Sequence, residues 1–271
     1  MRSLLLAVLA AYVVSAIHSV LAFVNKRRAL QRVSDGAIAI GFVLHTTALF
    51  ADWFVDGHYP LFYLRETLSF LAWTLIGSYA LVRYRYGAHA LGSFILPSVS
   101  LLTFVALLMG SPRGTQEPGG FSGTWLFPVH TSLLLFAYGA FFVVFVASVM
   151  YLLQERELKR KTFTGIFHRL PSLTTVNEIA TSAAAIGLAL LTVGIATGML
   201  WSSSRDGVLW HNDPKEIFAL LTWVLYLLLI VYRSTASWRG RSAAWLGVAG
   251  FALVLCTFFG ARWMGGYHVF G

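Results

Sequence analysis

The chain has 271 residues, of which 58% are apolar, 15% aromatic and only 11% charged. One water-soluble core of this size cannot bury so much apolar surface, whereas a bilayer solvates it directly, so the composition excludes a soluble globular protein and predicts an integral membrane protein. We interpret the net charge of +9 as a signal of membrane topology and not as a nucleic-acid-binding surface.

The apolar runs predict eight membrane-spanning helices. A spanning helix needs about 20 mainly apolar residues, and the alternating dyads of an outer-membrane barrel are absent. The first run is longer than the apolar segment of a secretory signal, so we expect a true span. No internal repeat stands out, which favours one all-α, polytopic membrane domain over residues 1–271. In chain order the predicted spans are 3–24, 35–54, 66–82, 90–109, 128–153, 177–200, 217–232 and 243–263.

The basic residues predict the orientation of these spans. Lysine and arginine near span ends mark the cytoplasmic side. One alternating set of loops holds 14 of the 20 basic residues, so both termini are expected on the outer, extracytoplasmic side of a cytoplasmic (inner) membrane. The 14 inner residues are Lys26, Arg27, Arg28, Arg32, Arg83, Arg85, Arg156, Lys159, Arg160, Lys161, Arg169, Arg233, Arg239 and Arg241.

Two further features concern the inner loop after the fifth span and the single cysteine. Glu155 and Lys159, like Glu157 and Lys161, are i,i+4 pairs of the favourable order, so the fifth helix is expected to continue beyond the membrane. Cys256 is the only cysteine, which leaves no disulfide within the chain and no Cys-x-x-Cys redox pair. Redox chemistry would therefore require a bound cofactor.

The segment 201–216, a predicted outer loop rich in tryptophan, concentrates polar and aromatic chemistry. It contains Trp201, Trp210 and Asp213, while His130 and His268 stand at the outer ends of the fifth and eighth spans. Two imidazoles on either side of an aromatic surface can hold an iron porphyrin, although histidines and tryptophans at span ends also belong to ordinary interfacial belts. Further rings and propionate partners for a porphyrin would be Trp125, Phe127, Arg65, Arg205 and Lys215.

Other histidines allow different roles. His18 and His45 lie inside predicted spans, where an ionisable group is costly and is a functional candidate by default, with an interhelical hydrogen bond as the alternative. His211 is expected on the surface of the outer loop.

Several stretches together resemble the CcsA/ResC/HemX family of haem-handling proteins of cytochrome c assembly. WSSSRDGVLWHNDPKE is similar to the tryptophan-rich loop of that family, which ends in W-x-W-D-P-K-E, except that Asn212 replaces the second tryptophan. GHYPLFYLRETLSFLAW, LHTTALF, LFPVHTSLLLF and GARWMGGYHVFG are similar to other family segments, the last three carrying His45, His130 and His268.

The resemblance implies a protein that receives haem and presents it on the outer face of the membrane. His130 and His268 would be the axial ligands of a non-covalently held, b-type haem, with Trp201, Trp210, Asp213 and His45 contributing to the site. Covalent attachment to an apocytochrome c would use a ResB-type partner protein, so the chain is not expected to act as an enzyme by itself.

Three alternatives remain open. The eroded loop and the segment 234–250 resemble short HemX-like members, linked to control of haem synthesis. A transporter of another small molecule is a second alternative, although the paired broken helices typical of such proteins are not evident. A b-type electron carrier is the third, with His18 and His45 as its only indication.

Overall fold

The computed structural model describes residues 2–56, 59–109, 124–161, 167–234 and 240–260. Within these residues the regular secondary structure is entirely helical, which confirms the predicted all-α class. The helices are α1 (Arg2–Asn25), α2 (Arg28–Asp56), α3 (Leu64–Tyr86), η1 (His89–Leu91), α4 (Gly92–Leu108), α5 (Leu126–Arg160), η2 (Phe167–Arg169), α6 (Leu173–Asp206), α7 (Pro214–Ser234), α8 (Arg241–Leu255) and the π-helical η4 (Cys256–Gly260).

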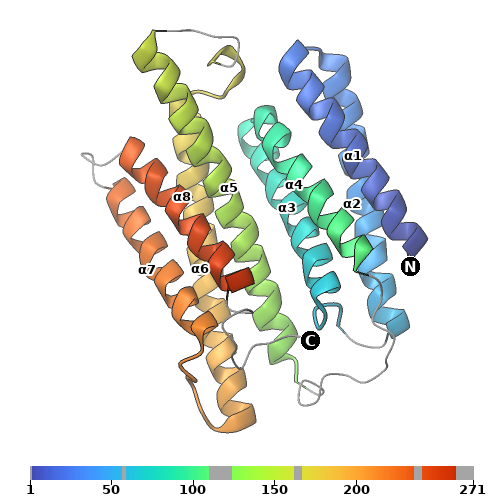
Figure 1. The fold of residues 1–271 in the computed structure, drawn as a ribbon, viewed down its shortest axis with the longest axis vertical. Helices are drawn as coiled ribbons and strands as arrows, with labels where there is room; N and C mark the ends of the chain where they lie inside the picture. The colour runs from blue at the N-terminus through green and yellow to red at the C-terminus, as the bar shows by residue number, and fades with distance from the viewer. Residues whose placement is uncertain (1, 57–58, 110–123, 162–166, 235–239, 261–271) are drawn as a thin grey trace. The chain divides into compact units, whose positions relative to one another are not determined.

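The chain divides into two compact units, residues 1–119 and 120–271. In unit 1, α1 packs against α2 and α4, and α3 packs against α4 and α2 (Figure 1). A Cβ atom at Gly41 of α2 would come within 2.6 Å of the Tyr12 ring of α1, so glycine is what permits this approach. The predicted single domain stays a prediction.

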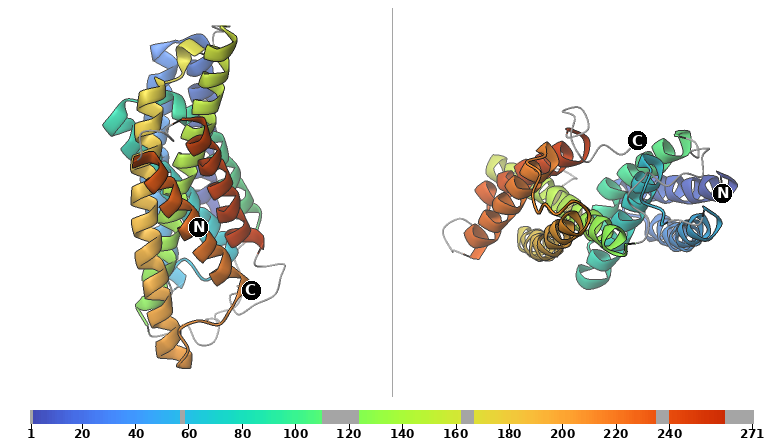
Figure 2. Two further views of the ribbon diagram at one scale, coloured as in Figure 1. Left: turned by 90° about the vertical axis from the view of Figure 1, so that its left-hand side faces the viewer. Right: turned by 90° about the horizontal axis from the view of Figure 1, so that it is seen from below.

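Unit 2 has the same packing order. Helix α5 packs against α6 and α8, while α7 packs against α8 and α6, and α5 and α6 lie side by side in both orientations (Figures 1 and 2). Its core is aromatic, because the fully buried rings of Phe141 and Tyr226 stack at a centroid distance of 3.6 Å. Glycines again face these rings: Gly187 lies against Phe141 and Gly250 against Tyr226.

Seven of the eight predicted spans are confirmed as helices long and apolar enough to cross a membrane. Helix α3 is not among them, because polar side chains lower its hydropathy. Several of these side chains, including Glu66, Ser69 and Thr74, are buried within unit 1. That α3 spans the membrane therefore stays a prediction.

The fifth helix continues beyond its predicted span, as its charge spacing indicates. Helix α5 reaches Arg160, and Lys159 Nζ lies 2.7 Å from Glu155 Oε1. The helix ends where Lys161 adopts a left-handed conformation with φ of 52°.

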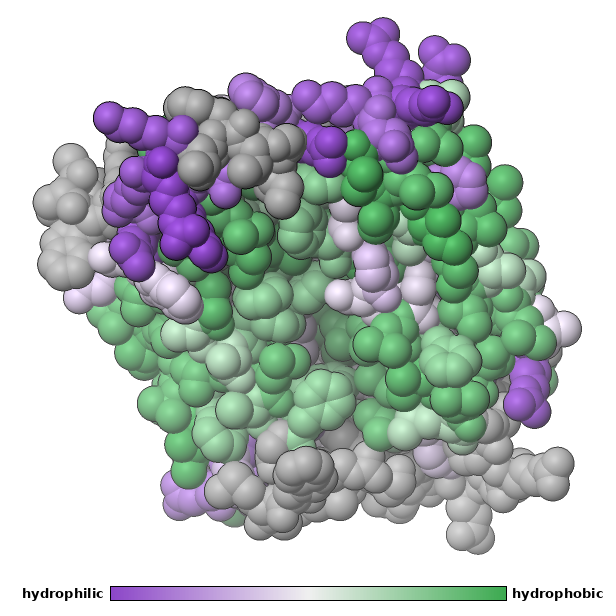
Figure 3. Space-filling view, turned by 45° about the horizontal axis from the view of Figure 1, so that its top comes forward, coloured by the Kyte–Doolittle hydropathy of each residue, from purple (hydrophilic) through white to green (hydrophobic). Residues whose placement is uncertain are grey.

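Apolar side chains are exposed along the helices of both units. Examples are Ile40, Val43 and Phe54 in α2 and Ile217 and Leu221 in α7. Hydrophobic side chains cover much of the face seen in Figure 3. This surface suits lipid, since hydrocarbon solvates it at no cost.

The orientation can be tested with cysteines placed at the two ends of the long helices. In a Cys256→Ala background, we expect a membrane-impermeant thiol reagent to label Ser204→Cys in intact cells and to spare Lys159→Cys. Both side chains are solvent-accessible, and permeabilised cells should label both. The reverse pattern in intact cells would contradict the predicted orientation.

Candidate functional site

The connection between α6 and α7 is shorter than the sequence indicates. Residues 201–206, expected in the loop, form the last turns of α6. Gly207 then ends the helix with φ of 72°, and its N–H donates to the Ser203 carbonyl at 3.0 Å. The end of the apolar run at residue 200 was therefore not the end of the helix, because polar residues continue α6 until a glycine supplies the left-handed cap.

A capping box begins α7 at Asp213, as predicted. Asp213 Oδ1 accepts the N–H of Lys215 at 2.8 Å, and Glu216 Oε2 accepts the N–H of Asp213 at 3.2 Å. Pro214 takes the first helical position, where no N–H is needed. Glu216 Oε2 also accepts the N–H of His211 at 2.9 Å, so one carboxylate holds the loop backbone at two points.

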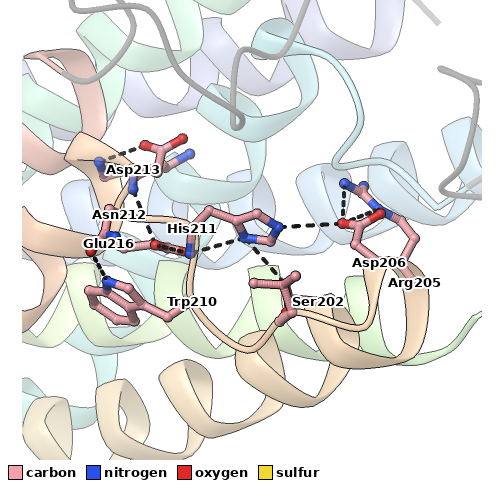
Figure 4. Close-up of polar contacts among 10 residues, drawn as sticks. Ser202, Arg205, Asp206, Trp210, His211, Asn212, Asp213 and Glu216 are labelled. Carbon is pink, nitrogen blue, oxygen red and sulfur yellow. Dashed lines mark hydrogen bonds and ion pairs between the residues drawn. The ribbon is translucent and has the colours of Figure 1, made fainter.

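His211 links the two ends of the loop, and its predicted position on the loop surface is wrong. Its side chain is only 17% exposed. Nδ1 lies 3.3 Å from Ser202 Oγ and 3.5 Å from Glu216 Oε1, while Nε2 lies 3.6 Å from Asp206 Oδ2 (Figure 4). The carboxylate contacts are ion pairs when the imidazole is protonated. The symmetric spacing of Asp206 and Glu216, five residues on either side of His211, was the available sequence signal.

Asn212 stands where the family motif has a tryptophan, and its backbone conformation suits that exchange. Its φ is 56°, in the left-handed region that asparagine adopts more readily than bulky residues do. Its Oδ1 accepts the indole N–H of Trp210 at 3.0 Å (Figure 4). The Trp210 indole is thus oriented by its neighbour in the loop.

Trp201 belongs to the interior of unit 2 and not to the loop. It is 4% exposed, and its ring lies 5.3 Å from that of Phe127 between centroids. The Arg205 guanidinium lies 4.8 Å from the Trp201 ring centroid, a cation–π contact, and pairs with Asp206 at 3.1 Å. Trp201 and Trp210 therefore have different surroundings, one packed and one partly exposed.

His130 lies in the second turn of α5 and contacts α6. Its Nδ1 lies 2.6 Å from the carbonyl oxygen of Gly194. A Cβ atom at Gly198 would come within 2.5 Å of His130 Cε1 and 2.6 Å of Nδ1, so the imidazole lies against a bare stretch of α6 backbone. Sequence reasoning missed both glycines, although the spacing of Gly187, Gly194 and Gly198 puts them on one helix face.

The start of α5 explains the position of His130. Thr124 Oγ1 accepts the N–H of Leu126 at 3.1 Å, and Pro128 stands in the first turn, where a missing N–H costs no hydrogen bond. These residues fix where the helix begins and hence which direction His130 faces.

Other candidate residues lie elsewhere. His45, in unit 1, is fully buried, with Nδ1 3.1 Å from the Tyr12 hydroxyl and Nε2 2.9 Å from Ser69 Oγ. His18 Nδ1 bonds within α1 to the Val14 carbonyl at 2.7 Å. Both His45 nitrogens thus contact protein groups in this structure, and its assignment to a cofactor site stays a prediction.

The remaining candidates complete the survey. Arg65 pairs with Asp52 in unit 1 at 3.4 Å. His268, the second predicted axial ligand, lies outside the described residues. Across the described part of the chain, no group of three or more His, Cys, Asp or Glu side chains could hold a metal ion.

Comparison with known proteins assigns the family. The family model described as cytochrome C assembly protein matches residues 61–268. The chain belongs to this family. The match spans both α3 and the whole of the α6–α7 connection, so it covers the segments on which the sequence resemblance was based.

Curated relatives agree with this assignment. The cytochrome c biogenesis protein CcsA of Guillardia theta is 27% identical, with 88% of this chain and 85% of that protein covered. The CcsA of Prochlorococcus marinus (strain MIT 9301) is 28% identical, covering 84% and 81% respectively. That of Trieres chinensis is 26% identical over 93% and 90%.

A solved structure shares the fold. The chain titled cytochrome c heme lyase CcmF matches with a TM-score of 0.71 at 16% identity, over 94% of this chain. This chain spans 45% of the length of that protein, so the likeness concerns the fold alone.

The Asp213 cap gives a first test of this site. We expect Asp213→Ala to lower the free energy of unfolding by about 0.5–2 kcal/mol, because α7 loses an N-cap acceptor, whereas Asp213→Asn should change it little. Thermal unfolding in detergent measures both. An equal, large loss in the two variants would mean that the carboxylate charge itself is required.

A second test concerns the His211 link. His211→Ala removes contacts with Ser202, Asp206 and Glu216, so amide hydrogen exchange in residues 207–213 should accelerate roughly tenfold, the change expected for a loss of about 1.4 kcal/mol. The exposed His89 provides the control, and His89→Ala should leave that exchange unchanged. Unchanged exchange in His211→Ala would contradict a linking role.

Proposed function

We propose that this protein binds haem non-covalently in unit 2 and presents it on the outer face of the cytoplasmic membrane for cytochrome c assembly. Membership of the cytochrome c assembly family supports the overall process. The relatives named CcsA and the structural neighbour titled heme lyase support haem as the ligand. The ligand assignment itself rests on the side chains of this chain.

The observation that carries the proposal is the hydrogen bond from His130 to the Gly194 carbonyl. A carbonyl oxygen only accepts, so the hydrogen is on Nδ1. In the neutral imidazole the lone pair is then on Nε2, which is the form that ligates iron. A second-shell carbonyl of this kind fixes both the tautomer and the ring orientation of a metal-binding histidine.

The α6–α7 connection supplies groups suited to a porphyrin edge. Trp210 provides a partly exposed indole, and Arg205 and Lys215 provide cations for propionates. Asp213 acts by holding the loop on α7 through its cap. Trp201 supports this region from beneath, packed on Phe127.

His130 and His268 would then hold a b-type haem, whose iron accepts a nitrogen lone pair at each axial position. Attachment to an apocytochrome c forms thioether bonds to cysteines of the acceptor, and this chain has the single cysteine Cys256. We therefore assign it a delivery role, with a ResB-type partner and the apocytochrome c as the other participants.

Absorption spectra of the purified protein test this function. Oxidised and reduced samples should show six-coordinate, low-spin haem. His130→Ala and His268→Ala should each abolish this spectrum by removing an axial nitrogen, and added imidazole should partly restore it. The exposed His168 is the control, and His168→Ala should retain the spectrum.

Two outcomes would contradict the assignment. If His130→Ala kept the wild-type spectrum, His130 would not be a ligand. If His211→Ala abolished the spectrum while His268→Ala kept it, the iron site would lie in the loop itself.

A further inference from the structure

The two units repeat one helical hairpin, formed by α2 and α3 in unit 1 and by α6 and α7 in unit 2. In each, a glycine of the first hairpin helix packs on an aromatic ring of the preceding helix. A Cβ at Gly41 would meet Tyr12 at 2.6 Å, and one at Gly187 would meet Phe141 at 2.5 Å. The two glycines therefore occupy corresponding positions.

A tryptophan fastens each hairpin in the same way. Five residues after each glycine stands a threonine, Thr46 in α2 and Thr192 in α6. Trp73 of α3 donates its indole N–H to Thr46 Oγ1 at 2.9 Å. Trp223 of α7 donates to Thr192 Oγ1 at 2.8 Å.

The second helix of each hairpin also begins alike. Seven residues before each tryptophan is a glutamate, Glu66 or Glu216, whose carboxylate accepts backbone N–H groups from the residues leading into its helix. A cation precedes each glutamate, Arg65 in α3 and Lys215 in α7.

At the opposite end, an arginine of the second hairpin helix bonds to the first. Arg83 pairs with Asp35, and Arg233 donates to Thr181 Oγ1 at 3.2 Å. Asp35 stands six residues before the glycine of its helix, as Thr181 does. The two hairpins thus share one register without gaps, a repeat that was not evident from the sequence because few identical residues mark it.

This register pairs Gly198 of α6 with Asp52 of α2, since each follows its glycine by eleven residues. In unit 1 the position carries a carboxylate that pairs with Arg65 at 3.4 Å. In unit 2 it carries no side chain, and the imidazole of His130 lies there instead. One framework thus fills this position with a carboxylate in one unit and accommodates a ring in the other.

We propose that Gly198 is a positioning residue for the iron ligand: together with the Gly194 carbonyl it forms a seat that fixes the ring plane of His130. This inference rests on the proposed function, because it assumes that His130 binds haem. A side chain at position 198 would push the imidazole away from the Gly194 carbonyl, which would change both its orientation and its tautomer preference.

The test compares two glycine-to-alanine variants of the same helix in haem-loaded protein. Gly198→Ala places a Cβ against the His130 ring, and Gly187→Ala places one equally close to the Phe141 ring. Both disturb the same α5–α6 contact, so both should lower the melting temperature. Only Gly198→Ala should shift the low-spin electron paramagnetic resonance signals and the midpoint potential and weaken haem binding about tenfold or more, with partial rescue by free imidazole.

The outcomes separate this inference from the proposed function. If His130→Ala loses the spectrum while Gly198→Ala keeps wild-type resonance signals and potential, the seat is wrong and the function stands. Equal spectral changes in Gly187→Ala and Gly198→Ala would also overturn it. If His130→Ala leaves the haem spectrum unchanged, the proposed function itself fails.

A double variant covers a failure of Gly198→Ala to fold. Removing the ring removes the steric conflict, so His130→Ala/Gly198→Ala should fold with a melting temperature close to that of His130→Ala. A double variant that fails to fold would show that Gly198 is needed for something other than seating His130, and would overturn the proposal.

Discussion

In a bilayer, apolar surface gains little by leaving lipid for a neighbouring helix, so the helices of unit 2 are held by how closely their backbones approach. The contact of α5 with α6 depends on glycines of α6. At Gly187 the absent side chain admits the ring of Phe141, which in turn stacks on Tyr226 of α7. The same seam, three turns later, brings His130 to the α6 backbone. Core packing and the orientation of the candidate ligand therefore follow from one constraint.

Polar contacts complement this packing where the membrane offers no water. Trp223 joins α7 to α6 through Thr192, and Trp73 joins α3 to α2 through Thr46. Such bonds satisfy indole N–H groups that would otherwise be costly in hydrocarbon. Buried His45 serves unit 1 similarly, because its ring contacts side chains of both α1 and α3.

The α6–α7 connection is ordered by carboxylates. Glu216 binds two backbone N–H groups, Asp213 caps α7, and Asp206 lies near His211. A short loop with this many fixed groups can present Trp210 in one orientation at little further entropic cost, which is an advantage for a surface that binds a flat ligand. The left-handed backbone at Asn212 contributes to the same end, since its side chain bonds to the Trp210 indole.

The sequence by itself determined the class of protein, the number of helices and the cap at Asp213. Composition, apolar run length and the order Asp213-Pro214-Lys215-Glu216 are local properties, and local hydrogen bonds and the bilayer act on them directly. Family membership was also accessible, since the motif around Trp210 survives apart from Asn212.

Only the tertiary structure decided what surrounds each candidate residue. The extension of α6 to Asp206 moved Trp201 out of the loop and into the packed interior, and the fold of the connection placed His211 between two helix ends. The seat formed by Gly194 and Gly198 was not predictable, because glycine leaves no chemical signal of its own and its meaning depends on which ring faces it. A position is read from the chain, but a contact requires two segments distant in sequence to meet, and their packing fixes that meeting.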